Sequence, residues 1–417
     1  MKSMRTITNM AIALTTMGGL ALAGHSAANA APSHASVTLN VASWSAAPAE
    51  ENAVKKLLAS FTKKTGIKTN YQVINGDYPT AMKARIASGT LPDIFYLNSD
   101  VAQDFIQSGA IHNLDFLKKV KSYQFNQLYA PLVKGFMWKG HVYAIPKDQS
   151  TLAVFYNKDM FKAAGISGPP KTEAQFTADA CKLTNTSKKI YGAVISNDMA
   201  RWTPFVYAAG GSVFNKQQTL VKLDNKGARQ SLTWYSNLVK KNCAALPSTV
   251  GASWNGDAFD KGLAGMVIEG DWLVQPTEQT APNMHWGVAP LPKGPKGYGN
   301  LDFTAAWAMS AKTKHFPQAS QLIEFLTNAN GEKIWDKDAA YLPARKNVNP
   351  KYAGIGGKAN VFMREIKYAR DWTFPPHGSA METPINNDLQ KVMQGQMSVS
   401  AALKDMSTQG TAALNVP

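Results

Sequence analysis

Apolar and polar residues alternate, or recur at helical spacing, along most of the chain. Val37 to Trp44 alternates in the manner of a strand, and apolar residues recur every three or four positions from Glu50 to Gly66. The pattern then predicts a strand around Val73, a helix from Tyr78 to Ser88 and an apolar strand from Asp93 to Leu97. This β-α-β-α-β order is typical of parallel sheets with helices on both faces.

A second series of the same kind follows Gly140. Its predicted strands are Leu152 to Tyr156, Ile190 to Ile195, Gly265 to Glu269 and Trp286 to Pro290. Helical segments separate these strands, and the last stretch, Ala359 to Leu414, is largely helical by pattern. The sequence therefore predicts an α/β protein in which a second α/β lobe follows the first.

The first thirty residues have the pattern of a secretory signal peptide. Lys2 and Arg5 form a charged start, Ala11 to Ala23 is apolar, and Ala28-Asn29-Ala30 offers small residues for cleavage. We therefore expect residues 1–30 to be a leader and the mature protein to be exported, to a periplasm or to the extracellular or cell-surface space.

We expect no membrane anchor. No later stretch reaches the roughly 18 uncharged apolar residues that a bilayer demands. Leu22-Ala23-Gly24 resembles the start of a lipoprotein box, but His25 stands where a lipid-bearing Cys would be needed. The mature protein is therefore expected to be soluble and not lipid-anchored.

The composition indicates a basic globular protein. With 417 residues, 45% of them hydrophobic, the chain can fill the cores of two or three domains. The formal charge is +16, or +14 without Lys2 and Arg5 of the leader. Because the lysines are dispersed and form no long basic tract, we expect solvated faces and no nucleic-acid site. An anionic surface or an acidic medium remains open as the reason for the charge. We expect a monomer.

Cys181 and Cys243 are the only two cysteines. An even number of cysteines in an exported chain favours one disulfide, and two separately buried thiols are the alternative. Two cysteines without nearby histidines make a poor zinc site, so we predict no metal site.

Motifs for catalysis are missing from the chain. It has no Walker loop, no dinucleotide-binding glycine pattern, no GxSxG and no HExxH, so we predict no enzyme and no cofactor. Glu50-Glu51, or Glu269 with Asp271, could be imagined as glycosidase carboxylates. Glu50-Glu51 opens a predicted helix, however, where acidic residues favour the helix dipole.

Aromatic and small polar residues gather at or just beyond the ends of predicted strands. In open α/β sheets, ligands bind outside the carboxyl ends of the strands. An aromatic face covers the apolar side of a pyranose, and polar side chains satisfy the sugar hydroxyls. We therefore expect a sugar-binding site that includes Trp44, Asn98, Asp100, Trp202, Asp271 and Trp272.

Several segments resemble the sugar-binding proteins of ABC transporters, a family that includes the maltose-binding protein. Ala87 to Ile94, ASGTLPDI, and Gly109 to Asp115, GAIHNLD, match two of its elements. Gly140 to Phe161 resembles its crossover into the second lobe, and Phe259 to Trp272, FDKGLAGMVIEGDW, resembles a segment that ends in Gly-x-Trp. The remaining matches are Trp286 to Pro292 and Leu342-Pro343-Ala344-Arg345.

The resemblance implies a two-lobed periplasmic-binding-protein fold of type II, with hinge crossovers and a helical C-terminal segment. The N-terminal lobe would comprise residues 37–147 and 303–345, and the C-terminal lobe residues 148–302 and 346–417. The sugar would bridge both lobes, hinge bending would close the cleft, and the closed form would dock on the ABC permease. The resemblance also adds Asp77 or Tyr78, Trp307 and Arg345 to the expected ligand-binding residues.

One family element departs from the pattern, because residues 170–176, PKTEAQF, lack its Trp. Three other functions stay open from the sequence. The chain could bind an anionic solute such as a glycerol phosphate or a sugar acid, it could be a secreted carbohydrate-active enzyme, or it could be a basic adhesion protein. Lysines or arginines facing the cleft would favour the first of these.

Overall fold

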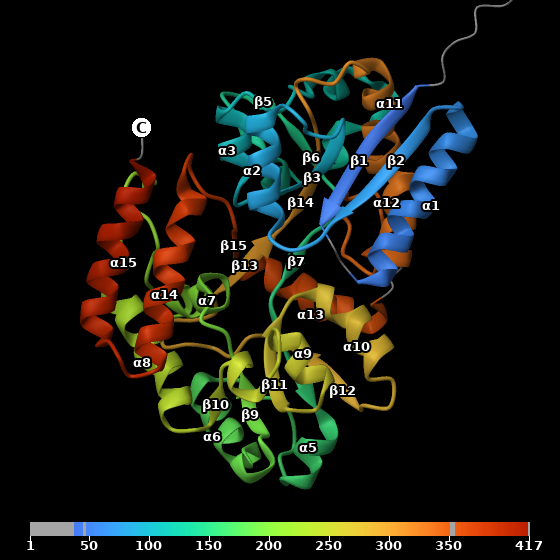
Figure 1. The fold of residues 1–417 in the computed structure, drawn as a ribbon. Coiled ribbons are helices and arrows are strands. Elements are labelled where there is room, and N and C mark those ends of the chain that lie inside the picture. The colour runs from blue at the N-terminus through green and yellow to red at the C-terminus, as the bar shows by residue number, and fades with distance from the viewer. Residues whose placement is uncertain (1–36, 45–46, 351–354, 416–417) are drawn as a thin grey trace, which may run out of the picture. The chain divides into compact units, whose positions relative to one another are not determined.

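The computed structural model describes residues 37–44, 47–350 and 355–415. The predicted leader, residues 1–30, lies outside them. Two five-stranded sheets, one three-stranded sheet and one two-stranded pair are formed by the part of the chain that is described (Figure 1). The architecture is mixed α/β, as the sequence predicts.

The first sheet has the strand order β2-β1-β3-β14-β6. Its strands are β1 (Thr38–Trp44), β2 (Lys68–Ile74), β3 (Ile94–Asn98), β6 (Ala144–Pro146) and β14 (Ala305–Met309). β1 runs parallel to β2 and to β3, whereas β14 is antiparallel to β3 and β6. A short antiparallel pair, β4 (Met137–Trp138) and β5 (His141–Val142), precedes β6.

Among the described residues, six α-helices are connected with the strands of the first sheet, and residues at their ends mark where some of them begin and stop. They are α1 (Pro48–Thr65), α2 (Tyr78–Ser88), α3 (Ala102–Gln107), α4 (Ala130–Lys134), α11 (Phe316–Thr327) and α12 (Ala329–Ala339). Pro48 opens α1, and Gly66 ends it in the left-handed region with φ of 77°. The apolar stripe of α1 is buried, and the helix packs beside α12, as Figure 1 shows.

The second sheet has the strand order β10-β9-β11-β8-β12. Its strands are β8 (Ala153–Asn157), β9 (Tyr191–Val194), β10 (Ala244–Ala245), β11 (Ala264–Glu269) and β12 (Trp286–Ala289). Its helices are α5 (Lys158–Ala163), α6 (Glu173–Leu183), α7 (Met199–Ala208), α8 (Lys226–Lys240), α9 (Asn255–Asp260) and α10 (Val274–Thr280). Two separate apolar clusters pack around this sheet, and a third packs around the first sheet.

A three-stranded sheet joins the segments that run between the two larger sheets. It has the order β15-β13-β7, with β7 (Ser150–Thr151), β13 (Asn300–Phe303) and β15 (Ala369–Asp371). β7 follows β6 after three residues, and β13 precedes β14 by one residue, Thr304. Two crossovers between the large sheets therefore run side by side, and β7 and β13 pair antiparallel there.

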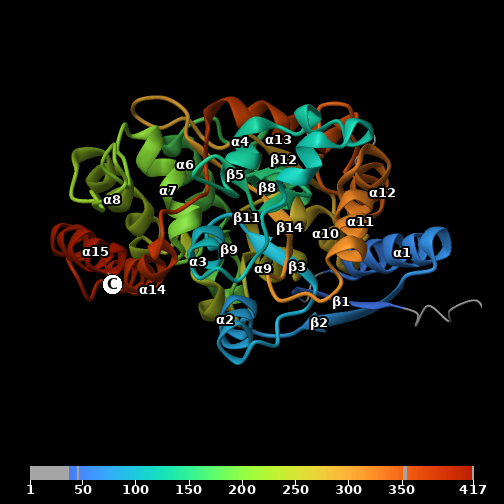
Figure 2. The same cartoon turned by 90° about the horizontal axis from the view of Figure 1, so that it is seen from above.

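Helices α13 (Ala359–Glu365), α14 (Glu382–Met393) and α15 (Val399–Leu414) form most of the C-terminal segment. α14 and α15 pack against each other and against α8, and they lie side by side in Figure 2. The prediction of a largely helical segment is confirmed, although the short strand β15 interrupts it.

The prediction of parallel sheets is wrong for two strands. β14 enters the first sheet antiparallel to its neighbours, and β8 is antiparallel to both β11 and β12 in the second. Each of these strands follows a crossover strand directly and not through a β-α-β unit, so the rule that makes such units parallel does not apply to it.

The strands of the first sheet come from residues 38–146 and 305–309, and those of the second from residues 153–289. The lobe boundaries inferred above, 37–147 with 303–345 and 148–302 with 346–417, stay a prediction. Among the described helices, none is long and apolar enough to cross a membrane.

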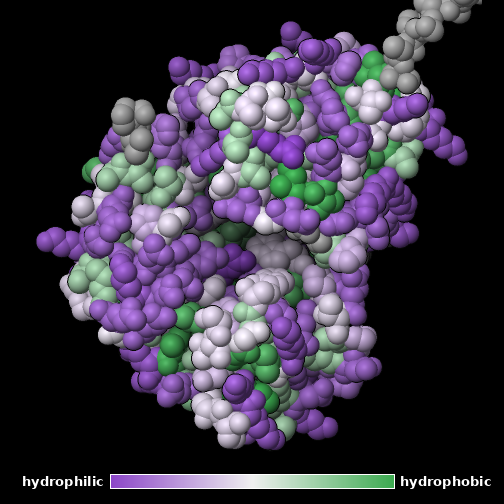
Figure 3. Space-filling view, viewed as in Figure 1, coloured by the Kyte–Doolittle hydropathy of each residue, from purple (hydrophilic) through white to green (hydrophobic). Residues whose placement is uncertain are grey.

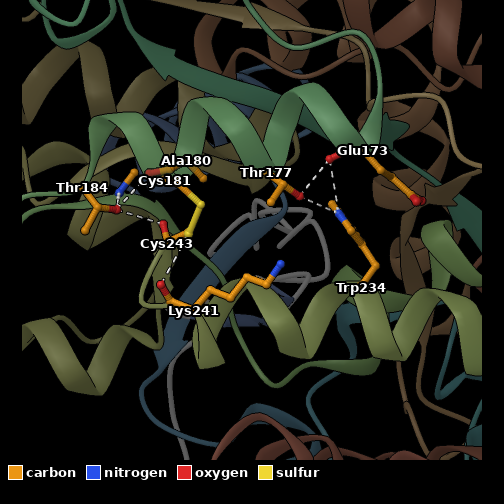
Figure 4. Close-up of a disulfide and its surroundings, with 9 residues drawn as sticks. Glu173, Thr177, Ala180, Cys181, Thr184, Trp234, Lys241 and Cys243 are labelled. Atoms are coloured by element: carbon orange, nitrogen blue, oxygen red, sulfur yellow. Dashed lines mark hydrogen bonds between the residues drawn. A yellow bond between two sulfur atoms is a disulfide. The ribbon is translucent and has the colours of Figure 1, made fainter.

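Cys181 and Cys243 form a disulfide in the structure (Figure 4). It links α6 to the residue before β10, while Trp234 of α8 donates from Nε1 to the Thr177 hydroxyl at 3.0 Å. α6 is thus tied to α8 and to the segment after it at two points. Cys181 is exposed and Cys243 is buried, so a reductant can reach the bond from one side.

The disulfide is expected to stabilise the folded protein by constraining the unfolded chain. The two cysteines are 62 residues apart, and a closed loop of that length contributes between about 2 and 4 kcal/mol. The double variant C181A/C243A should therefore unfold at a lower urea concentration than the oxidised protein. Wild-type protein in excess reductant is the matched control and should follow the variant. Coincident curves for the oxidised and reduced wild type would show that the bond does not stabilise the fold.

Candidate functional site

A cavity of about 340 Å³ is lined by residues of both large sheets and of the C-terminal segment. The surface is hollowed near the place where Figure 1 labels β7 and β13 (Figure 3). Its aromatic lining is Trp44, Trp272, Phe303, Tyr341 and Trp372. Its charged lining is Asp100, Asp148, Asp198, Arg201 and Glu382. The volume lies in the range of small-molecule sites.

Trp44 forms one aromatic wall at the end of β1. Its ring packs edge-on against Tyr78, with 5.5 Å between the ring centroids, and in a tilted orientation against Tyr96, with 4.6 Å between the centroids. Tyr78 is itself fixed, because its hydroxyl donates to the Tyr96 carbonyl at 3.0 Å. Trp44 is only partly buried, so part of the indole remains free to contact a solute.

Trp272 lines the cavity from the turn after β11. Its Nε1 donates to Glu269 Oε2 at 2.9 Å, and its ring meets Phe303 edge-on at 5.4 Å. Gly270 allows this arrangement, since a Cβ at that position would lie 2.3 Å from a ring carbon of Trp272. The Gly-x-Trp spacing in the sequence therefore has a steric reason.

Arg201 is the cation of the cavity lining and is held between two carboxylates. It donates to Asp198 Oδ2 and to Glu269 Oε2, each at 2.7 Å. Its guanidinium carbon also lies 5.5 Å from the centre of the Trp272 ring. Charge-assisted bonds of this kind are strong, so Arg201 is fixed in place before any solute arrives.

Asp148 lies at the crossover between β6 and β7. It is paired with Lys147, and its Oδ1 accepts from the Ala305 amide at 2.8 Å. Lys147 is 2% exposed, and its ammonium sits 4.1 Å from the Trp335 ring centre and 4.4 Å from that of Tyr96. Cation–π contact and the ion pair together compensate for the burial of this charge.

Asp100 and Glu382 face one another from different parts of the fold. Asp100 follows β3, and Glu382 opens α14. Burial raises the pKa of both carboxyl groups, and Asp100, whose side chain lies within hydrogen-bonding reach, raises the pKa of Glu382 further. Hydrogen bonds from the backbone amides of Asp100 and Val101 lower the pKa of Asp100, whereas the nearby carboxylates of Asp104 and Asp198 raise it. The pair therefore favours holding a proton.

Four of the ten predicted ligand-binding residues line this cavity: Trp44, Asn98, Asp100 and Trp272. The structure brings them together from β1, β3 and the turn after β11. The other six do not line it.

Tyr78 packs against the Trp44 ring, and Asp77 caps α2, where its carboxylate accepts a hydrogen bond from the Thr80 amide at 3.1 Å. That bond and the one from the Thr80 hydroxyl lower the pKa of Asp77.

Trp202 and Trp307 are core residues, contrary to the sequence prediction. Trp202 is fully buried, and its Nε1 donates to the Ser231 hydroxyl of α8 at 3.1 Å. Trp307 is in the middle of β14, 4.5 Å from the ring of Tyr96. The side chain before Trp202, Arg201, is the one that lines the cavity, because successive helical residues point in different directions.

Arg345 is also placed away from the cavity. Its guanidinium is fully buried and donates to the carbonyls of Thr327 at 3.0 Å and Gln124 at 2.9 Å, and also to that of Tyr123. Its planar donors satisfy backbone groups that would otherwise be buried without partners. Arg345 thus holds the end of α11 to the loop before α4.

Asp271 is buried beside the crossover strand β7 and does not line the cavity. Its amide donates to the Ser150 hydroxyl at 3.0 Å, and its Oδ2 accepts from the Leu342 amide at 3.1 Å. It is 1% exposed, and this burial raises its pKa to about 8. Asp271 therefore connects segments of the chain that are far apart in sequence.

Sequence reasoning missed Asp148, Asp198, Arg201, Trp372 and Glu382. Asp148 lies in the crossover segment that the family resemblance identified, so that segment could have indicated it. Asp198 and Arg201 follow β9, which ends at Val194, so the strand-end rule could have indicated both of them. Trp372 and Glu382 come from a segment whose return to the cavity has no local signal. It returns because β15 pairs with β13.

A larger cavity of about 960 Å³ adjoins the first and shares Trp372 with it. Its lining includes Trp138, Phe214, Lys216 and Arg370.

Among residues 37–44, 47–350 and 355–415, no group of three or more His, Cys, Asp or Glu is arranged to hold a metal ion. The first cavity therefore offers aromatic faces, carboxylates and one arginine, whereas the larger cavity also has basic side chains in its lining.

The amino-acid sequence of this chain is similar to those of a known protein family. The sequence model of the bacterial extracellular solute-binding proteins matches residues 56–361. A binding protein of Brucella abortus is 26% identical over 361 residues, which cover 84% of this chain and 86% of the relative.

Two solved structures resemble the fold closely. An ABC substrate-binding protein of Listeria monocytogenes in complex with cycloalternan has a TM-score of 0.83 and 24% identity, with 91% of this chain and all of that chain covered. The maltotriose-binding protein of Thermus thermophilus has a TM-score of 0.79 and 19% identity, with 90% of this chain and all of that chain covered. The predicted type II binding-protein fold is confirmed by these matches.

The raised pKa of Asp271 predicts a pH-dependent effect of D271N on stability. An unfolded Asp ionises near pH 4, whereas buried Asp271 keeps its proton to about pH 8. Its contribution to stability is therefore full below about pH 4 and is lost as the pH rises towards 8. Asn cannot ionise, so D271N should gain stability over the wild type progressively across this range.

Urea unfolding of both proteins at several pH values between 4 and 8 checks this expectation. D224N is the matched control, because the Asp224 side chain is 47% exposed and its partner Arg229 keeps its charge throughout this pH range. A difference between D271N and wild type that stays constant with pH would contradict the assignment of Asp271 as a buried, protonated connector.

Proposed function

Since this chain belongs to the bacterial extracellular solute-binding proteins, we propose that it captures a sugar or oligosaccharide and delivers it to the permease of an ABC importer. Its family is one of binding proteins, and the chain is not an enzyme. The protein would act outside the cytoplasmic membrane after export. The relatives whose structures hold cycloalternan and maltotriose support a carbohydrate cargo.

The observation that carries this proposal is the aromatic and polar lining of the 340 Å³ cavity. Trp44 and Trp272 offer indole faces for the apolar sides of sugar rings, and carboxylates beside them accept hydrogen bonds from hydroxyl groups. A sugar there would contact Trp44 of the first sheet and Trp272 beside the second at the same time. Such contacts favour the closed state, since a ligand shifts a conformational equilibrium only by its differential affinity.

An anionic solute is the less favoured cargo. Four carboxylates and a single arginine line the cavity, and that arginine already binds Asp198 and Glu269. A phosphate or sugar acid would have to enter against these negative charges. Among the described residues, no lysine lines this cavity.

A thermal-shift screen with mono-, di- and oligosaccharides tests the proposal. A ligand that binds only the folded protein raises its melting temperature, and the strongest ligand can then be titrated by tryptophan fluorescence. If no carbohydrate raises the melting temperature of the correctly folded mature protein, the proposed cargo class is wrong.

Replacement of Trp44 or Trp272 by Ala should weaken binding of that ligand at least about tenfold, which corresponds to about 1.4 kcal/mol. The loss reflects the missing aromatic face, and circular dichroism should show that each variant is folded. Y298A is the control, because Tyr298 is 43% exposed and lines neither of the two adjoining cavities. Unchanged affinity in both tryptophan variants would place the sugar elsewhere.

A further inference from the structure

Most charges of the proposed sugar cavity are already paired within the protein. Asp148 is bound by Lys147, and Asp198 and Glu269 bind Arg201 from two sides. These groups can accept further hydrogen bonds from a solute, but a cation already compensates each of them. They do not require a charged cargo.

Asp100 and Glu382 are different, because no basic side chain bonds to either of them among the described residues. The charged groups that act on the pair are Asp104 of α3, Asp198 at the N-terminal cap of α7 and Arg201 of α7. Asp104 is bound by Lys83, 3.3 Å away, and Arg201 is held by its own carboxylates, although its charge still lowers the pKa of Glu382. The Asp100 carboxylate accepts hydrogen bonds from the backbone amides of Asp100 and Val101. Among the described residues that line the cavity, the pair thus comprises the carboxylates to which no cation is bonded.

The position of the pair suits recognition of a solute. Asp100 lies in the same strand-end turn as Asn98, and Glu382 lies at the start of α14, which packs on α7 and α8. Both side chains line the same cavity as Trp44, Trp272 and Trp372. A ligand group between them would contact the first sheet and the C-terminal helices together.

We propose that Asp100 and Glu382 together bind a protonated amino group, so that the cargo of this protein is an amine-bearing sugar. This inference rests on the proposed function of the cavity. An ammonium between the two carboxylates turns their repulsion into two charge-assisted hydrogen bonds. Neighbouring indole faces attract the same cation, because the face of an aromatic ring carries negative charge. A neutral sugar gains neither contribution.

Binding of such a cation should displace the proton that the empty pair favours. Burial raises the pKa of both carboxyl groups, neighbouring carboxylates raise both further, and a bound ammonium lowers both again. The proton passes from the pair to the buffer when the amine enters. A neutral sugar leaves that proton in place, so proton release separates the two kinds of cargo.

Isothermal titration calorimetry with three sugars of equal length tests the proposal. The probes are the glucosamine trimer, the N-acetylglucosamine trimer and maltotriose, used at about pH 6, where the free amine is charged. The glucosamine trimer should bind at least about tenfold more tightly than either neutral trimer. Repetition in two buffers of different ionisation enthalpy should show release of up to about one proton with the amine alone.

D100N and E382Q should each reduce the preference for the free amine and the proton release. Two variants are used because one replacement could disturb the fold, and melting curves identify such a case. D159N is the control, since it removes an exposed carboxylate outside the cavity lining and should keep the preference.

Each result decides one question. Equal affinity for all three trimers without proton release overturns the amine proposal but leaves sugar binding intact. Tighter binding of a neutral trimer does the same. A preference for the amine that survives in both D100N and E382Q overturns the assignment to this pair. If none of the trimers binds but another carbohydrate does, the amine proposal is wrong and sugar binding stands. If neither the trimers nor any carbohydrate in the thermal-shift screen binds, the proposed function itself is refuted.

Discussion

The pairing of Asp148 with the returning crossover is the interaction on which the site depends. Asp148 Oδ1 accepts from the Ala305 amide, its carbonyl accepts from the Thr304 hydroxyl at 2.8 Å, and the Lys147 amide donates to the Ala305 carbonyl at 2.9 Å. These bonds join the segment that leaves the first sheet after β6 to the segment that returns to it as β14. Because both segments line the cavity there, these bonds also hold that part of the cavity wall in place.

This arrangement requires a buried charge, and the surroundings of Lys147 explain how it is tolerated. Burial of an ion pair costs several kcal/mol unless its remaining hydrogen-bonding and electrostatic needs are met. Lys147 meets them with Asp148, with Glu50 at 3.8 Å, and with the faces of Trp335 and Tyr96. Tyr341 and Trp44 complete the ring of aromatic side chains around the ammonium and also line the cavity. Tyr341 and Trp44 therefore both surround the buried ammonium and form part of the cavity wall.

The sequence predicted what depends on local pattern. Helical and strand spacing located β1, α1, α2 and β3 within a few residues, and four of the residues that the strand-end rule named, Trp44, Asn98, Asp100 and Trp272, line the cavity. It misplaced Trp202, because a helix directs neighbouring side chains to different sides and only Arg201 faces the cavity. It misplaced Trp307, which lies mid-strand between β3 and β6. Trp372 and Glu382 could not be found, since their positions follow from the pairing of β15 with β13 far earlier in the chain.

The fold determines where a solute binds, whereas the paired and unpaired charges determine which solute fits. Trp44 and Trp272 are held by strand ends and by Gly270, so any protein with this backbone could present aromatic walls at these places. Selectivity must come from groups that the backbone does not dictate. Arg201 and Lys147 bond to their own carboxylate partners, whereas no basic side chain in the described part of the chain bonds to Asp100 or Glu382. In a chain whose formal charge is +16, this local negative point stands out from its surroundings. A cargo that carries the missing positive charge satisfies the pair without a proton, and that requirement distinguishes this cavity from one suited only to neutral sugars.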